Sequence, residues 1–283
     1  MTVYLNGAYM PLAEARIPVL DRGFIFGDGV YEFIPVYSKR PFRITEHLGR
    51  LQASLDSIRL LNPLELDAWC ERIETLIAAQ DFDDQAVYIQ VTRGVAPRDS
   101  AFPVNTSPTI FIMANPLLTP TAEIKAAGVC AITAMDNRWL RCDIKAVSLL
   151  PNVLLRQQAV DAECAEAILL RDGFLTEGTA SSIFVVKAGV LLAPPKSNLV
   201  LPGITYDLVL ELAAMHGIPH QVRPISEAEV RAADELWMAS SPKEVLAIVE
   251  LDGKAVGSGR PGHAALQMDA FYQQYKTQVM RGE

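Results

Sequence analysis

The chain has 283 residues, of which 50% are hydrophobic and 20% are charged, and this composition predicts a soluble globular protein of about two domains. Its 33 acidic residues outnumber its 25 basic residues, and the net charge of −8 argues against nucleic acid or an anionic membrane as a partner. No segment approaches the roughly 18 apolar residues of a membrane span, and the N-terminus lacks a signal-peptide pattern, so we expect a cytoplasmic protein.

The first part of the chain is rich in strand and hairpin patterns. Asn6-Gly7 separates two short strand-like segments, which is typical of a two-residue hairpin turn. Apolar residues three and four positions apart predict a helix over residues 46–61, capped by Thr45. The other segments predicted here are strands at residues 30–37, 87–92 and 109–113, a helix at 66–79 and a linker at 116–121.

The second part alternates strands, turns and helices. Its predicted segments are strands at residues 129–134, 183–186, 190–193, 235–239 and 245–249, a hairpin at 167–175 that turns at Asp172-Gly173, a further turn at Asp252-Gly253, and helices at 151–162, 204–215 and 264–277. Helices between turn-linked strands predict an α+β (mixed α/β) fold with two domains, a small one at residues 1–117 and a larger one at 118–283. No glycine pattern of a dinucleotide-binding or P-loop fold is present.

The cysteines and histidines give no sign of a metal site. Four scattered cysteines without a CxxC pair predict neither a zinc site nor a disulfide framework, and they are Cys70, Cys130, Cys142 and Cys164. The four histidines are dispersed without the spacing of metal ligands. We therefore expect no bound metal and a reducing compartment.

One lysine stands out among apolar and aromatic neighbours. Lys145 ends the segment RWLRCDIK at residues 138–145. Burial disfavours a charged amine, and a neutral amine is what Schiff-base chemistry requires. For a lysine considered alone, a solvent-exposed side chain at a strand end is the more common situation.

Five motifs in order along the chain resemble the class IV pyridoxal-phosphate aminotransferases. The motifs are RGFIFGDGVYE at residues 22–32, VTRG at 91–94, RWLRCDIK at 138–145, LTEGTASSIF at 175–184 and PGIT at 202–205. Together they are most similar to the D-amino acid aminotransferase branch. The resemblance implies the two-domain architecture of fold type IV, with pyridoxal 5'-phosphate at the domain interface and the Schiff-base lysine in the larger C-terminal domain.

The resemblance also implies roles for the two most distinctive side chains. Lys145 would form the Schiff base with the cofactor and then carry a proton between the substrate and the cofactor. Glu177 would face the pyridine nitrogen and keep it protonated. An isolated glutamate in such a turn would otherwise be expected in solvent.

The cofactor phosphate needs hydrogen-bond donors and positive charge. Ile204 and Thr205 open a predicted helix whose free amides and dipole suit an anion. Ser240 and Ser241 follow a predicted strand, and Arg50 lies beside the apolar stripe of the first helix, where its guanidinium suits a phosphate. Ordinary helix capping and a solvated salt bridge are the alternatives for these residues.

The resemblance implies that the substrate carboxylate is held by Tyr31, Arg98 and the residue two positions after this arginine. That residue is Ser100, where the D-amino acid branch has histidine, and Asp99 adds a negative charge that competes for the arginine. The change retunes substrate preference or favours amines without a carboxylate. A solvated loop arginine is the alternative for Arg98.

The function that follows from the resemblance is transamination of D-amino acids such as D-alanine with a 2-oxo acid such as 2-oxoglutarate, by a ping-pong mechanism in a homodimer. The alternatives are a 4-amino-4-deoxychorismate lyase, or a branched-chain or (R)-amine aminotransferase of the same fold. A non-catalytic binding protein is a third possibility, against which the intact Lys145 and Glu177 argue. The sequence leaves open the preferred donor and acceptor, the effect of Ser100, and assembly beyond a dimer.

Overall fold

The computed structural model describes residues 1–282, and the chain divides by its internal packing into two units. The first unit comprises Met1–Leu117 and Ile144–Leu149, and the second comprises Leu118–Asp143 and Leu150–Glu283. The short segment 144–149 therefore packs with the N-terminal part of the chain. Our domain prediction assigns Lys145 to residues 118–283, whereas internal packing groups it with the first unit.

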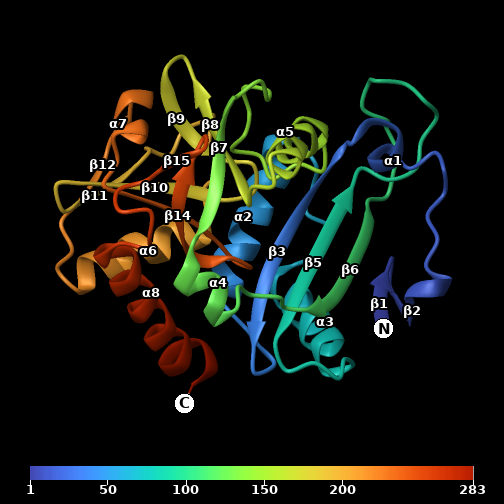
Figure 1. Cartoon of the computed structure of the whole chain (residues 1–283). Coiled ribbons are helices and arrows are strands. Elements are labelled where there is room, and N and C mark those ends of the chain that lie inside the picture. Colours follow the sequence, from blue (N-terminus) through green and yellow to red (C-terminus); the bar gives the residue numbers. More distant parts are fainter. Residues whose placement is uncertain (283) are drawn as a thin grey trace. The chain divides into compact units, whose positions relative to one another are not determined.

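The first unit is built on a six-stranded sheet in which every adjacent pair is antiparallel, in the order β2-β1-β6-β5-β3-β4 (Figure 1). Its strands are β1 (Thr2–Leu5), β2 (Ala8–Pro11), β3 (Gly29–Tyr37), β4 (Arg40–Pro41), β5 (Gln85–Thr92) and β6 (Thr109–Pro116). Its helices are α1 (Arg22–Phe26), α2 (Ile44–Ser57) and α3 (Leu66–Ala78), with one turn of 3-10 helix at Leu12–Glu14.

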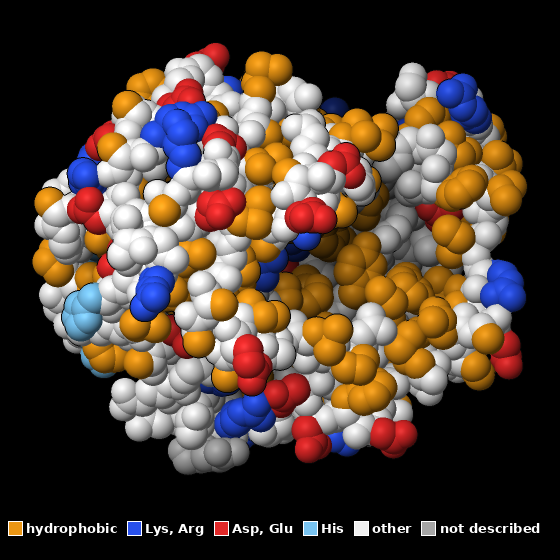
Figure 2. Space-filling model, in the orientation of Figure 1, with side chains coloured by type: hydrophobic (Ala, Val, Ile, Leu, Met, Phe, Trp, Pro, Cys, Tyr) orange, Lys and Arg blue, Asp and Glu red, His pale blue; other side chains and the backbone are white. Residues whose placement is uncertain are grey.

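One face of this sheet carries the core of the unit, and the opposite face is partly exposed. Side chains alternate between the faces because successive residues of a strand point in opposite directions. Leucines of α2 and Trp69 of α3 pack on the buried face against residues such as Ile34 and Ile89. On the opposite face the half-buried Tyr31 stacks on Tyr88, with ring centroids 5.6 Å apart. Figure 2 shows hydrophobic side chains gathered over β3, β5 and β6.

The predicted start and end of α2 were wrong. The helix begins at Ile44 after Arg43, which has a positive φ of 48° and no side-chain capping bond, so Thr45 is not the cap. It ends at Ser57, because Arg59 adopts a positive φ of 55° that turns the chain out of the helix. Helix and strand boundaries depend on such local backbone conformations, which the apolar periodicity does not specify.

The second unit contains a nine-stranded mixed sheet in the order β12-β11-β10-β13-β14-β7-β8-β9, with β15 also paired to β14. Parallel pairs join β11 to β12, β14 to β7, and β7 to β8. The strands are β7 (Val129–Met135), β8 (Glu166–Arg171), β9 (Phe174–Gly178), β10 (Ser182–Lys187), β11 (Val190–Ala193), β12 (His220–Val222), β13 (Glu235–Ser240), β14 (Glu244–Leu251) and β15 (Lys254–Ala255).

Helices cover this sheet and complete the mixed α+β architecture. They are α4 (Ala122–Ala127), α5 (Leu150–Asp161), α6 (Ile204–Met215), α7 (Glu227–Arg231) and α8 (His263–Tyr275), which continues into a π-helical segment at Lys276–Arg281. Buried residues of α5, such as Leu155, pack on β7 and β8. Within residues 1–282, no helix combines the length and the apolar character needed to cross a membrane.

The cysteines differ from expectation. Cys130 at the start of β7 and Cys164 in the connection between α5 and β8 form a disulfide, with Cα atoms 4.9 Å apart. The parallel pairing of β7 with β8 brings these two positions together although 34 residues separate them in the chain. The prediction of no disulfide was therefore wrong, because it relied on sequence spacing alone. Cys70 and Cys142 are free.

Candidate active site

Lys145 lies on a short segment that runs beside β3 in the first unit. The Lys145 carbonyl accepts a hydrogen bond from the Tyr31 N–H at 2.9 Å, and the Lys145 N–H donates to Ser54 Oγ at 3.3 Å. Ala146 forms an antiparallel bridge with Val30. These bonds fix the backbone so that Lys145 Nζ lies 4.1 Å from the centroid of the Tyr31 ring. The structure thus brings together two of the predicted site residues.

A buried ionic cluster lies in the same unit. Arg50 of α2 donates to both oxygens of Glu32 on β3, from Nε to Oε2 at 2.9 Å and from Nη2 to Oε1 at 2.6 Å. His47 Nδ1 lies 3.0 Å from Glu32 Oε1. Burial opposes ionisation of Glu32, but the charge of Arg50 and the bonds from His47 and Arg50 outweigh it, so its pKa lies well below the ordinary value. Arg50 is thereby held in a fixed orientation by a carboxylate.

The loop that carries Arg98 and Ser100 also belongs to the first unit. The Arg98 guanidinium lies 5.5 Å from the centroid of the Phe26 ring. The Asp99 carboxylate accepts the Ala101 N–H at 3.0 Å, and among the described residues it forms no ion pair with Arg98. The expected competition of Asp99 for Arg98 is therefore not observed, because the carboxylate caps its own loop.

Glu177, at the end of β9 in the second unit, takes part in a second buried ionic cluster. Arg138 Nη1 donates to Glu177 Oε1 at 2.6 Å, and the Leu201 N–H donates to Oε2 at 3.1 Å. Arg138 also grips Asp136 through two bonds of 2.9 Å, and Asp136 pairs with Arg171 at 3.0 Å. Two arginines thus share two carboxylates within the second unit.

The two carboxylates of this cluster differ in acidity. Burial raises the pKa of Glu177 to about 7, although the charge of Arg138 and the hydrogen bonds from Arg138 and Leu201 act in the opposite direction. Burial also acts against ionisation of Asp136, but the hydrogen bond and charge of Arg138 outweigh it and lower the pKa of Asp136 to about 2. Asp136 is therefore ionised near neutral pH, whereas Glu177 is only partly ionised. A further cation close to Glu177 would shift this carboxyl group toward its ionised form.

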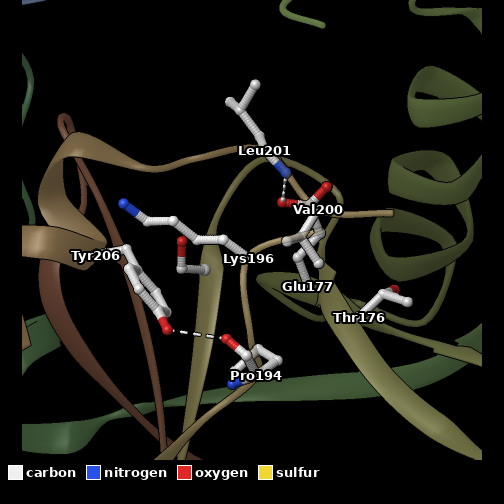
Figure 3. Close-up of a pocket in the computed structure, with 8 residues that line it drawn as sticks. Thr176, Glu177, Pro194, Lys196, Val200, Leu201 and Tyr206 are labelled. Carbon is white, nitrogen blue, oxygen red and sulfur yellow. Dashed lines mark hydrogen bonds between the residues drawn. The ribbon is translucent and has the colours of Figure 1, made fainter. Parts of the chain in front are cut away.

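A small pocket, partly open to solvent, lies beside Glu177 (Figure 3). Its eight lining residues all come from the second unit and are Thr176, Glu177, Ser182, Pro194, Lys196, Val200, Leu201 and Tyr206. The Tyr206 hydroxyl donates to the Pro194 carbonyl at 2.8 Å, which ties α6 to the loop after β11. The wall of the pocket therefore combines the Glu177 carboxylate and the Lys196 amine with hydroxyl-bearing and apolar side chains.

The residues predicted to bind phosphate, apart from Arg50 in the first unit, lie at the start of α6 and at the end of β13 in the second unit. Ile204 and Thr205 form the first turn of α6 and are buried. Gly203 precedes them, and a side chain there would come within 2.9 Å of Ser182 Oγ. Ser182 pairs with Ala239, directly before Ser240 at the end of β13. The start of α6 therefore lies beside the start of β10, which is paired with the end of β13.

Several residues of these clusters were not singled out from the sequence. Glu32 lies between Val30 and Ile34 on the buried face of β3. A carboxylate at a position where the alternation of side chains predicts an apolar residue could have indicated a buried ion pair. His47 adjoins the leucine stripe of α2 in the same way. Arg138 stands within a quoted motif, but nothing local to the motif indicated its partners.

Comparisons with known proteins identify the family of this chain. The model of the family "Amino-transferase class IV" matches residues 29–251. A D-alanine aminotransferase of Bacillus licheniformis is 38% identical over 262 residues, which are 93% of this chain and 92% of that protein. A D-alanine aminotransferase of Staphylococcus haemolyticus is 34% identical over 274 residues, which are 96% of this chain and 97% of that protein.

Solved structures match over nearly the whole chain as well. The branched-chain amino acid aminotransferase of Escherichia coli superposes with a TM-score of 0.90 at 27% identity, covering 100% of this chain and 95% of that one. The branched-chain aminotransferase of the archaeon Thermoproteus uzoniensis gives a TM-score of 0.87 at 27% identity, with the same coverage of 100% and 95%. Another branched-chain amino acid aminotransferase, solved with pyridoxamine 5'-phosphate, gives a TM-score of 0.91 at 26% identity, covering 99% of this chain and 94% of that one. With its fold, its motif residues and its near full-length relatives in accord, the chain belongs to the class IV aminotransferases.

Proposed function

We propose that this protein transfers the amino group of D-amino acids to a 2-oxo acid with pyridoxal 5'-phosphate as its cofactor. The observation that carries the proposal is the similarity, over more than nine-tenths of the chain, to proteins named D-alanine aminotransferase. D-Alanine and 2-oxoglutarate are the substrate pair that we expect first.

The residues present fit this cofactor. Lys145 supplies an amine, and Glu177 supplies a buried carboxyl group whose ionised form would pair with a protonated ring nitrogen. The amides at the start of α6, which has no side-chain cap in the described structure, suit a phosphate. The residues that would hold the cofactor are Arg50, Lys145, Glu177, Ile204, Thr205, Ser240 and Ser241.

When bound, the cofactor withdraws electrons from the substrate and so weakens the Cα–H bond. Lys145 is the residue to which we assign the proton transfer, with Nζ accepting the proton from the substrate Cα. Its backbone is held by β3 and Ser54, so the flexible part of the residue is its four-carbon side chain alone. Arg138 and the Leu201 N–H orient the Glu177 carboxylate and favour its ionised form.

The substrate carboxylate needs a cation and hydroxyl groups. Tyr31, Arg98 and Ser100 supply these groups. The Asp99 carboxylate accepts the Ala101 N–H and does not pair with Arg98, so the charge of Arg98 remains available for the substrate. By analogy with the family, we further propose a homodimer in which this loop serves the site of the partner subunit. Mixing the inactive Lys145→Ala and Arg98→Ala proteins tests this arrangement, because only shared sites would regain activity.

The main experiment follows D-alanine turnover. Purified protein loaded with pyridoxal 5'-phosphate is mixed with D-alanine and 2-oxoglutarate, and pyruvate and D-glutamate are quantified by chiral chromatography. We expect both products in equal amounts, loss of activity in Lys145→Ala, and full activity in the control Lys187→Ala, whose exposed side chain pairs with Asp234. Absence of both products with the wild type would refute the proposal.

A second candidate function rests on the solved branched-chain aminotransferases that superpose on nearly the whole chain. Turnover of L-leucine in place of D-alanine would support it. Pyruvate released from aminodeoxychorismate without any 2-oxo acid would instead indicate the lyase. Turnover of an (R)-amine but not of D-alanine would indicate an amine aminotransferase.

A further inference from the structure

Three charged residues form a compact cluster in the first unit, which we name the arginine clamp: Arg22, Asp28 and Arg93. Arg22 Nε donates to Asp28 Oδ2 at 2.8 Å, and Arg93 grips the same carboxylate from Nε at 2.8 Å and from Nη2 at 3.0 Å. Both arginines are almost fully buried. Burial opposes ionisation of Asp28, but the two arginines outweigh it and lower its pKa. The clamp is therefore a fixed ionic structure.

The clamp holds the loop at residues 98–102, which we call the carboxylate loop. Arg22 Nη1 donates to the Asp99 carbonyl, and Nη2 donates to the Ser100 carbonyl at 3.4 Å. Because its Nε is committed to Asp28, the Arg22 guanidinium has one orientation toward these carbonyls. An exposed loop bound in this way has lost much of its conformational freedom before any substrate arrives.

Two aromatic rings secure the ends of the carboxylate loop. At its start, the Phe26 ring has Arg22 at 4.8 Å and Arg98 at 5.5 Å from its centroid. At its end, the Phe102 ring has Arg93 at 3.9 Å and Arg59 at 5.3 Å. Each ring therefore lies close to an arginine of the clamp, and the stacking restricts the direction in which the Arg98 side chain leaves the loop.

We propose that Arg22, Asp28 and Arg93 are positioning residues that present Arg98 to the carboxylate of the amino-acid substrate, and that they thereby set the preference for amines that carry a carboxylate. This inference rests on the function proposed above. The inference also explains how the carboxylate loop works with Ser100 in place of the expected histidine. The fixed loop backbone orients the Arg98 side chain, which compensates in part for the missing histidine side chain.

The test uses Arg22→Met, which leaves Asp28 paired with Arg93 through two bonds and so leaves no buried charge without a partner. The control is Arg72→Met. This arginine belongs to the same unit, but it contacts Tyr4, Ala68 and Glu71 instead of the carboxylate loop. Steady-state kcat and KM of the cofactor-loaded proteins, with 2-oxoglutarate as the acceptor, are measured with D-alanine and with (R)-1-phenylethylamine, which has no carboxylate. Hydrogen exchange of the peptide 95–103 is measured on the same proteins.

For Arg22→Met we expect kcat/KM for D-alanine to fall at least about tenfold, mainly through KM, with a change of less than about twofold for (R)-1-phenylethylamine. We also expect faster exchange in residues 95–103 and no change in either readout for Arg72→Met. An equal fall for both amines, or unchanged exchange, would overturn the inference. If the wild type does not react with D-alanine, the proposed function fails, whereas the exchange measurement still decides whether the clamp holds the loop.

Two milder variants keep the proposal testable if Arg22→Met does not fold. Arg22→Lys retains the positive charge with fewer hydrogen-bond donors, and we expect its KM for D-alanine to be higher than that of the wild type. Phe26→Leu removes the ring beneath Arg98 and is expected to raise KM for D-alanine without affecting (R)-1-phenylethylamine. Identical kinetics of both variants and the wild type with D-alanine would contradict the assignment.

Discussion

The pairing of Arg138 with Glu177 predicts a large loss of stability when the arginine is removed. In Arg138→Leu, Asp136 keeps Arg171 and Thr176 as partners, whereas Glu177 keeps, among residues 1–282, only the Leu201 N–H. Removing one partner of a buried ion pair costs about 3–5 kcal/mol, and the remaining partners of Asp136 place this variant near the lower end, at about 3 kcal/mol. For a chain of this size, that corresponds to a fall in Tm of about 6–12 °C.

The pH dependence of this loss gives a second check. Burial raises the pKa of Glu177 to about 7 with Arg138 in place, and loss of Arg138 raises it further. A carboxyl whose folded-state pKa is raised loses stability as the pH rises from its unfolded value of 4.5 through the folded pKa. In the variant this loss extends to higher pH, so its deficit relative to the wild type should be larger at pH 8 than at pH 6.

The assay is urea unfolding followed by circular dichroism at both pH values, with Glu177→Gln and the double variant completing a mutant cycle. We expect the double variant to be more stable than additivity predicts by about 1–3 kcal/mol, because it has no unpaired carboxylate at position 177. The control is Arg141→Leu, which removes a largely exposed partner of Asp143 and should change stability by less than about 0.5 kcal/mol. Additive effects, or a deficit below about 1 kcal/mol at pH 8, would refute the reasoning.

Three further outcomes follow from individual positions. The pKa of Asp136 is lowered from 3.8 to about 2, so the stability that its ionised form contributes is present above about pH 4 and is lost as the pH falls toward 2. Measured as the unfolding free energy during an acid titration, the loss should be about 2 kcal/mol. An unfolding free energy that stays constant over this range would contradict the prediction. Leu55→Ala opens a cavity in the fully buried core of the first unit and should cost about 2–5 kcal/mol in urea unfolding, and a cost below about 1 kcal/mol would mean that the site collapses. Gly94→Ala places a Cβ 2.0 Å from the Ser107 carbonyl oxygen at a φ of 90°, so a clear drop in Tm is expected, and an unchanged Tm would show that the backbone adjusts freely.

Much of the local structure could be predicted because it depends on near neighbours in the chain. The Asn6-Gly7 hairpin, the central strand over residues 30–37 and the helix at residues 66–79 follow from turn chemistry and apolar periodicity. The ends of α2 could not be predicted in this way, because they depend on positive φ angles at Arg43 and Arg59 that neither residue type favours. The family motifs gave the class of enzyme because they stand in the right order along the chain.

The sequence by itself therefore determined the family and the alternation of strands and helices, and it singled out Lys145 and Glu177 as candidate site residues. Only the tertiary structure decided what these residues touch. Segment 144–149 joins the first unit through its bonds to β3, and Arg138 reaches Glu177 across 39 residues. Such contacts join residues that are far apart in the sequence, and they depend on the order and register in which the strands pair. A pattern within a window of neighbouring residues does not contain that information.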